Sequence, residues 1–404
     1  MKTKNIDRSY LTVNFLMELA PAFFYATYQL FLLSKGLDYL QINLINACFM
    51  ASRFAMEIPT GVFADLLGRK RSVQLGLAAL SLSFFAYYLA ETFWYFILAE
   101  VIGAFGGTCV SGAFKAWFVD ERKLAGGNGD NVKVFAVGGQ FKYLAMIFGS
   151  GVGAQFGARN LAYPWLLSAG FMALALAVAT VLMKERRELQ KTGKAISFKP
   201  IAKIARDSVD YGLRHRGVMQ LVYLSAIMAF VAMPFNMMWP VTFKGFGMSV
   251  NQLGLAMAAI SGCLWFGAWL APHFNRSIRQ EFHALVFSQI LTACSMLIAS
   301  LMLGGLTTFI FFLAHEVGRG MFEPLNDALL NQQIENDSCR ATILSFESML
   351  ANSGAVLGLI CSGYVAKYLG IGSAWLMAAV VLAAGFTLVF SRRNGSFREG
   401  RQPT

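Results

Sequence analysis

Twelve apolar runs, each long enough to cross a lipid bilayer, follow one another along this chain. A helix needs about 20 apolar residues to span roughly 30 Å of hydrocarbon, so each run predicts one membrane-spanning helix. Only 14% of the 404 residues are charged, whereas soluble domains average about 25%. We therefore predict an all-α polytopic membrane protein. Its expected spans are 10–33, 41–64, 72–90, 94–118, 134–156, 164–183, 217–242, 250–273, 283–303, 306–330, 343–367 and 371–391.

Positive charges gather at alternate ends of these runs. The two termini, the turns after 41–64, 94–118, 250–273 and 306–330, and the stretch 184–216 together hold 26 of the 34 Lys and Arg residues. Cytoplasmic segments retain Lys and Arg, so this distribution predicts that both termini are cytoplasmic. We attribute the formal net charge of +12 to Lys and Arg residues that set the topology and contact anionic lipid headgroups. We therefore expect no nucleic-acid partner.

The cationic stretch 184–216 separates six spans from six. We predict an N-terminal six-helix bundle at 1–183, a cytoplasmic linker at 184–216 and a C-terminal six-helix bundle at 217–404. Within the linker, residues 201–206 alternate apolar and basic side chains, which favours a short helix at the headgroup surface. Two equal halves are typical of transporters built from internal repeats around a central cavity.

The turn between the second and third spans carries the most specific string of the chain. It reads Gly61-x-x-x-Asp65-x-x-Gly68-Arg69-Lys70-Arg71. This string resembles, residue for residue, the signature between helices 2 and 3 of the major facilitator superfamily. The resemblance covers nearly the whole length and implies two pseudo-symmetric six-helix bundles that rock against each other.

Further strings fit a bacterial branch of that superfamily, with two departures. Residues 57–61, 111–120 and 340–345 match the branch. Many proton-coupled members carry an arginine midway along helix 4, but the aligned position here is Glu100. The segment 149–157 has glycines without the proline that is typical of helix 5 in proton-antiporting exporters, which makes drug export by antiport a weaker interpretation.

The resemblance implies that the turn latches the two halves on the cytoplasmic side. Asp65 is suited to the N-terminus of another helix, here that of span 343–367, and Arg69 is expected to pair with Asp120. Gly61 and Gly68 are expected to allow close helix approach and a tight turn. The alternative is that the turn only stops membrane insertion. The candidate gating residues are Gly61, Asp65, Gly68, Arg69, Lys70, Arg71 and Asp120.

Ionisable residues inside apolar spans are expensive, so each is a functional candidate. The first span carries one polar stripe around Glu18, which we interpret as a proton-binding or substrate carboxylate. Arg53 and Glu57 lie one turn apart and are expected to form an ion pair. This pair either stabilises the structure or takes part in coupling transport to its energy source. Arg319 lies between two acids of its span. These residues either contact the substrate or form an internal network whose charges only neutralise one another. The candidate substrate-binding or coupling residues are Asn14, Glu18, Tyr25, Gln29, Arg53, Glu57, Lys142, Asn236, Trp239, Glu316, Arg319 and Glu323.

These features predict a secondary active transporter rather than an enzyme. The chain has no Gly-x-x-x-x-Gly-Lys-Ser/Thr string, so the energy is expected from an ion gradient, with protons as the ion. Mixed acids and bases favour a small charged or zwitterionic organic solute. The alternatives are a proton-driven multidrug efflux antiporter, with Glu18 as its acid, and a polytopic membrane enzyme, for which the expected metal-ligand strings are missing.

The expected surroundings follow from the same reasoning. We expect no cofactor, no metal and no catalytic residue, with the proton gradient as energy source. The expected partners are a small-molecule substrate and membrane lipids, and the chain is expected to be a monomer. We expect it in the inner (cytoplasmic) membrane as a multi-pass protein.

Overall fold

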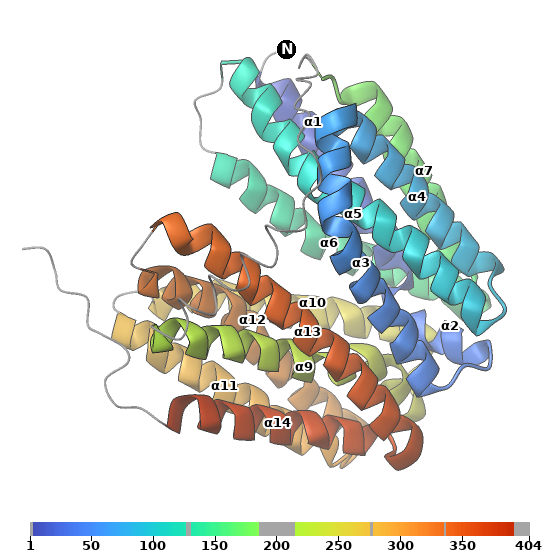
Figure 1. Cartoon of the computed structure of the whole chain (residues 1–404). Helices are drawn as coiled ribbons and strands as arrows, with labels where there is room; N and C mark the ends of the chain where they lie inside the picture. The colour runs from blue at the N-terminus through green and yellow to red at the C-terminus, as the bar shows by residue number, and fades with distance from the viewer. Residues whose placement is uncertain (1–2, 127–130, 186–214, 275–277, 335–336, 392–404) are drawn as a thin grey trace, which may run out of the picture. The chain divides into compact units, whose positions relative to one another are not determined.

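The computed structural model describes residues 3–126, 131–185, 215–274, 278–334 and 337–391, which are helical almost throughout (Figure 1). The chain divides into two compact units, residues 1–196 with 248–261 and residues 197–247 with 262–404. Most of the linker predicted at 184–216, including its amphipathic segment, lies outside the described residues.

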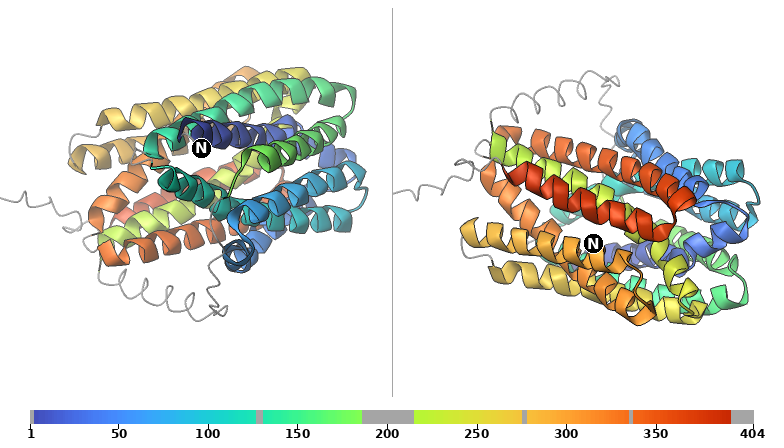
Figure 2. Two further views of the ribbon diagram at one scale, coloured as in Figure 1. Left: turned by 90° about the horizontal axis from the view of Figure 1, so that it is seen from above. Right: turned by 90° about the horizontal axis from the view of Figure 1, so that it is seen from below.

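The first unit is built from the helices that precede the linker. Helix α1 packs against α6 and α7, α4 packs against α5 and α7, and α3 packs against α5. The helices lie alongside one another as a bundle (Figure 2). They are α1 (Thr3–Tyr25), α2 (Tyr28–Ser34), α3 (Tyr39–Leu67), α4 (Arg69–Leu89), α5 (Phe93–Leu124), α6 (Asn131–Arg159) and α7 (Tyr163–Leu182).

The second unit repeats this pattern of neighbours. Helix α9 packs against α13 and α14, while α11 packs against α12 and α14. Residues Met248–Ser261, which include the first half of α10, cluster with the first unit. The helices after the linker are α9 (Arg216–Gly245), α10 (Val250–Leu270), a short 3₁₀ helix (Ala271–Phe274), α11 (Ile278–Ser300), α12 (Gly305–Gln333), α13 (Asp337–Leu369) and α14 (Ile371–Ser391).

Each predicted span coincides with a helix, and several helices continue past the apolar run. In the described residues, eight helices are long and apolar enough to cross a membrane, or nine if α1 and α2 form one bent span. Helices α3, α6 and α12 fall short of this composition. They are also the helices that carry Arg53, Lys142 and Arg319. The count of twelve spans stays a prediction.

The first predicted span is bent, which corrects the expectation of one continuous polar stripe. Helices α1 and α2 meet at an angle of 48°. At the break, the Thr27 amide donates to the Phe24 carbonyl at 2.9 Å, so the turn tightens to an i→i+3 bond before α2 begins. Tyr28 and Gln29 follow the break and therefore leave the face of α1 that carries Glu18.

Glycines bring helix backbones into direct contact in both units. On α6, a Cβ at Gly153 would overlap the Phe23 carbonyl of α1, and one at Gly149 would lie 2.6 Å from the Ala22 Cβ. On α13, a Cβ at Gly358 would overlap the Phe230 carbonyl of α9. Small residues at such spacing are how membrane helices pack closely. The glycine-rich segment without proline thus has a packing role.

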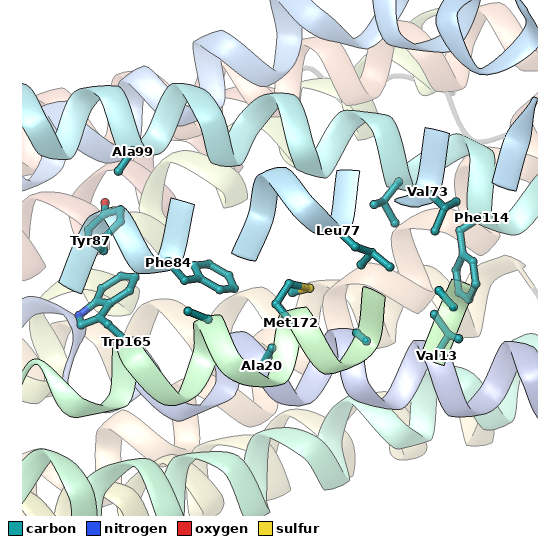
Figure 3. Packing of buried hydrophobic residues seen from close by; sticks show 14 of the residues in the cluster. Val13, Ala20, Val73, Leu77, Phe84, Tyr87, Ala99, Phe114, Trp165 and Met172 are labelled. Carbon is teal, nitrogen blue, oxygen red and sulfur yellow. The ribbon is translucent and has the colours of Figure 1, made fainter. Parts of the chain in front are cut away.

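A buried tryptophan near the start of each unit's last helix organises the aromatic core. Trp165 of α7 stacks on Phe24 of α1 with ring centroids 4.1 Å apart. Trp375 of α14 stacks on Phe235 of α9 at 4.5 Å. Figure 3 shows Trp165 beside Tyr87 and Phe84 within the apolar core of the first unit. These contacts hold the first and last helices of each unit together.

We predict that Gly153→Ala destabilises the protein, because the added Cβ has no room against the α1 backbone. Overpacking of this kind costs about 1–3 kcal/mol. The measurement is the midpoint of thermal unfolding of the purified protein in detergent, followed by tryptophan fluorescence. Gly151→Ala is the matched control, because a Cβ there meets nothing within 4 Å. Equal midpoints for the two variants would contradict the packing role.

Candidate functional site

A single residue, Gly68, joins α3 to α4 and builds the signature turn. Its φ of +93° lies in the region that favours glycine, and its amide donates to the Ala64 carbonyl at 3.1 Å. The next residue, Arg69, forms an ion pair with Asp120 of α5 at 2.6 Å. The predicted contact between these two residues is confirmed. Their side chains are 20% and 35% exposed, so a pair of this kind is worth about 0–1 kcal/mol.

Glu185, just beyond the end of α7, caps the same turn. Its carboxylate accepts from the backbone amides of Arg69 at 2.8 Å and Lys70 at 3.2 Å, at the positive end of α4. The Lys70 ammonium donates to the Thr180 carbonyl of α7 at 2.9 Å. Gly68 is required here for a second reason, because a Cβ would lie 2.8 Å from a Glu185 oxygen. Sequence reasoning missed Glu185, since backbone amides carry no signal in the sequence.

The remaining gating candidates are only partly described. The Asp65 side chain lies outside what the structure describes, so its predicted contact with the start of span 343–367 is not tested. Arg71 is exposed. The expected close helix approach at Gly61 is not met, since a Cβ there would meet nothing within 4 Å. The latch role stays a prediction.

Glu18 lies among polar groups from three helices of the first unit. The positive charges of Lys142 on α6 and Lys115 on α5 act on its half-buried carboxylate. The same carboxylate acts on the phenols of Tyr10 and Tyr25. Asn14, one turn before Glu18, donates to the Gly138 carbonyl of α6 at 3.1 Å. The structure therefore brings Glu18, Lys142 and Tyr25 near enough to one another for their charges to interact.

Three further candidates of this unit do not join that cluster. The expected ion pair between Arg53 and Glu57 is wrong for the described coordinates: Arg53 lies over the Phe49 ring at 5.7 Å. Both charged side chains are exposed, where an ion pair gains little and a cation–π contact competes with it. Gln29 is buried in α2, and its amide atoms have no hydrogen-bond partner.

The second unit holds an ion pair with an amide attached. Arg319 of α12 donates through Nη2 at 2.6 Å and Nε at 2.8 Å to one oxygen of Glu316, one turn earlier. Its Nη1 donates to Asn236 of α9 at 2.8 Å. Glu316 is 1% exposed and Arg319 is 20% exposed, so the charge is balanced inside the helix pair while the guanidinium stays accessible. The predicted proximity of Arg319 to Glu316 is present, whereas the contact of Arg319 with Asn236 was not predicted.

The other candidates of the second unit lie around this pair. His315 is fully buried, its Nδ1 donates to the Phe312 carbonyl at 2.7 Å, and its Nε2 lies 3.8 Å from Glu316. Trp239 belongs to an aromatic group with Phe312. Glu323 is exposed, and among the described ion pairs none joins it to Arg319. Glu323 therefore lies apart from the ion pair.

Sequence reasoning did not place Glu100 among the candidates, yet it has the most enclosed polar environment of the first unit. Tyr87 of α4 and Tyr28 of α2 both donate to its Oε1, the second at 3.5 Å. Asn46 of α3 donates to the Tyr28 hydroxyl at 2.8 Å. Four helices thus converge on one carboxyl group. In the described part of the chain, no group of three or more His, Cys, Asp or Glu side chains could hold a metal ion.

Charged clusters inside apolar helices, in two units with the same internal pattern, define a polytopic solute transporter. A family model described as Major Facilitator Superfamily matches residues 10–338. The chain belongs to the Major Facilitator Superfamily. It is therefore a multi-pass all-α membrane transporter and not an enzyme. The family resemblance carried by residues 61–71 is confirmed.

Known relatives and solved structures agree with this family. The chain is 24% identical over 376 residues to YxaM, an uncharacterized MFS-type transporter of Bacillus subtilis (strain 168), with 90% of each chain covered. The nucleoside transporter NupG is 16% identical, with a TM-score of 0.80 over 96% of this chain and 100% of NupG. A bacterial homolog of the human lysosomal transporter Spinster is 14% identical, with a TM-score of 0.72 over 96% of each chain. At these identities the structures show the fold.

We predict that Glu185→Ala destabilises the protein, because it leaves the first amides of α4 without an acceptor. Loss of a helix N-terminal cap costs about 0.5–2 kcal/mol. The measurement is the thermal unfolding midpoint in detergent. Lys184→Ala is the matched control, because that side chain is exposed and only its backbone carbonyl accepts a bond, from Trp117. An unchanged midpoint in Glu185→Ala would show that the cap adds nothing.

Proposed function

We propose that this chain is a proton-coupled secondary active transporter that moves a small charged or zwitterionic organic solute by alternating access. The proposed location is the cytoplasmic membrane with both termini in the cytoplasm, as the Lys and Arg distribution favours. The observation that carries the proposal is the partly accessible guanidinium of Arg319 within a predicted membrane span. Placing a charged side chain inside a membrane costs free energy, so such a side chain is a candidate for a function.

Arg319 is suited to hold an anionic group of the solute. A guanidinium has five N–H donors. Nε, Nη1 and Nη2 each give one to Glu316 or Asn236, which leaves two N–H donors. Glu316 balances the charge and fixes the plane of the guanidinium, so the free donors are presented to a carboxylate or phosphate without reorganisation.

The first unit by itself carries groups of both signs of charge that suit a charged solute. The charges of Lys142 and Lys115 act on the Glu18 carboxylate, although none of the described ion pairs includes Glu18. We propose that the Glu18 carboxylate binds the solute and that Lys142 contacts an acidic group of the solute. A cluster that holds a carboxylate with ammonium groups recognises a zwitterion better than a neutral sugar. The energy source is the proton gradient, and no cofactor is proposed.

Two solved transporters with similar folds define the competing substrates. One is named a nucleoside transporter, and another is a POT family structure in complex with 5-aminolevulinic acid, with a TM-score of 0.68. A nucleoside carries no fixed charge, whereas 5-aminolevulinic acid is a small zwitterion. The charged groups around Glu18 and Arg319 favour the zwitterion as the class of solute for this chain.

The test is uptake into proteoliposomes under an imposed pH gradient. Labelled pools of amino acids, organic acids, nucleosides and organic cations are compared. We expect one charged or zwitterionic pool to accumulate above its outside concentration and to leak out when a protonophore is added. Nucleoside uptake alone, or accumulation of organic cations alone, would contradict the proposed class of solute. Flux that does not respond to the pH gradient would contradict proton coupling.

Arg319 supplies the internal control for this assay. Loss of one partner in a buried charge contact costs about 2–5 kcal/mol, so Arg319→Gln should lower solute affinity more than about tenfold. Arg319→Lys keeps the charge and loses the planar fork, and it should fall between Gln and wild type. The thermal unfolding midpoint of each variant separates lost binding from lost folding. Wild-type uptake in Arg319→Gln would contradict the assignment.

For the signature turn, we propose a latch that opens and closes in each cycle. Asp65→Asn should cut transport strongly while expression survives, because the side chain keeps its shape and loses its charge. The measurement is turnover in proteoliposomes, normalised to protein incorporated. Arg71→Gln is the matched comparison for a charge change in the same turn, since that side chain is exposed. Wild-type turnover in Asp65→Asn would end the latch proposal.

A further inference from the structure

Glu100 is a carboxyl group enclosed without a cation. It lies on α5 and is 9% exposed. The titratable groups that act on it are two phenols, Tyr87 of α4 and Tyr28 of α2, and the group that α3 directs there is the neutral Asn46. Phenol donors favour the carboxylate, but they are neutral and do not replace the lost hydration of a full charge.

Glu316, a buried acid of the second unit, differs from Glu100 in this respect, because it is bonded to Arg319. A buried carboxylate with a cation beside it can stay ionised, whereas one without a cation takes up a proton instead. The contrast separates Glu100 chemically from the acid that positions Arg319.

The space around Glu100 is filled by stacked rings. Tyr87 lies flat on Trp165 with centroids 4.0 Å apart and an angle of 7° between the planes. Trp165 in turn stacks on Phe24. Figure 3 shows Tyr87 and Trp165 face to face at one end of the core, next to Ala99, the residue before Glu100. Glu100 thus lies beside packed aromatic rings, and a proton needs no cavity there.

Tyr28 connects Glu100 to the bend between α1 and α2. It is the first residue of α2, directly after the 48° break. Its hydroxyl lies 3.3 Å from that of Tyr87 and 3.5 Å from Glu100, and its side chain is partly exposed. A change of angle between α1 and α2 moves this hydroxyl relative to the carboxyl group. The break therefore offers a way to open the enclosure to water.

We propose that Glu100 is the proton-binding site of this transporter. With Tyr28 and Tyr87 closed on Oε1, the acid is protonated on Oε2. When the α1–α2 break opens, the O–H bond breaks, the proton passes to water, and the carboxylate keeps the electron pair. Proton binding stands on its own geometry, whereas its use to drive transport rests on the function proposed above.

The experiment is an infrared pH titration of the purified full-length protein in detergent. Subtracting the spectrum of Glu100→Gln from that of wild type isolates the C=O stretch of this acid. We expect a protonated-acid band near neutral pH that wild type shows, Glu100→Gln lacks entirely, and alkaline pH removes. Glu91→Gln is the matched control, because Glu91 is 67% exposed and ion-paired with Lys35. It should leave the band unchanged.

A second variant keeps the test decisive if Glu100→Gln does not fold. Tyr87→Phe retains the stack on Trp165 and removes a donor to Glu100, so it should shift the same band to higher frequency. An ionised Glu100 throughout the titration, or a band unaffected by both variants, would overturn the proposal.

The two proposals fail in different ways. Proteoliposomes in which no solute responds to the pH gradient would refute proton-coupled transport and leave the infrared band in place. Gradient-driven accumulation that Glu100→Gln retains at the wild-type level would refute the coupling role of Glu100 and leave the transporter in place. Loss of accumulation in Glu100→Gln, with solute exchange across the membrane retained, would support both.

Discussion

The balance of charge inside each unit is the constraint on which the arrangement depends. A charged side chain within an apolar helix cannot be hydrated and needs a partner close by. Arg319 and Glu316 meet this need within one turn of α12, while Glu18 uses lysines from α5 and α6. The Arg319 and Glu316 pair is neutral within its own unit, so that unit can move as a body without leaving this buried charge unpaired.

The two units share one packing plan and differ in the chemistry placed upon it. Glycines of α6 and α13 meet the backbones of α1 and α9, and Trp165 and Trp375 stack on the same two helices. Beside the stack, the first unit buries Glu100 and the second buries His315. A repeated scaffold fixes where a polar group is enclosed, and the residue type decides what it binds. We infer that the halves have taken on different roles.

Much of the fold was predictable from the sequence, because lipid leaves a helix few alternatives. All predicted spans contain a helix, and errors lie at the ends, where α13 begins at Asp337, ahead of the predicted span 343–367, because a helix can extend beyond its apolar run. The contact between Arg319 and Glu316 follows from their spacing. The environment of Glu100 does not, since Tyr28 and Tyr87 look like packing residues and meet only through the bend and the bundle. Spacing alone also misled, since Arg53 lies over Phe49 and not beside Glu57.

The signature turn combines a fixed part with a part weak enough to switch. The bonds from the α4 amides to Glu185 involve the backbone, and Gly68 lets the carboxylate approach, so this cap is part of the unit itself. The ion pair of Arg69 with Asp120 is partly exposed, and its small net stability lets the arginine exchange partners at little cost. A latch needs both properties, because a rigid frame transmits motion while a strong bond would trap one state. In the latch that we propose, the capped start of α4 provides the frame, and the guanidinium directly after Gly68 provides the contact that opens.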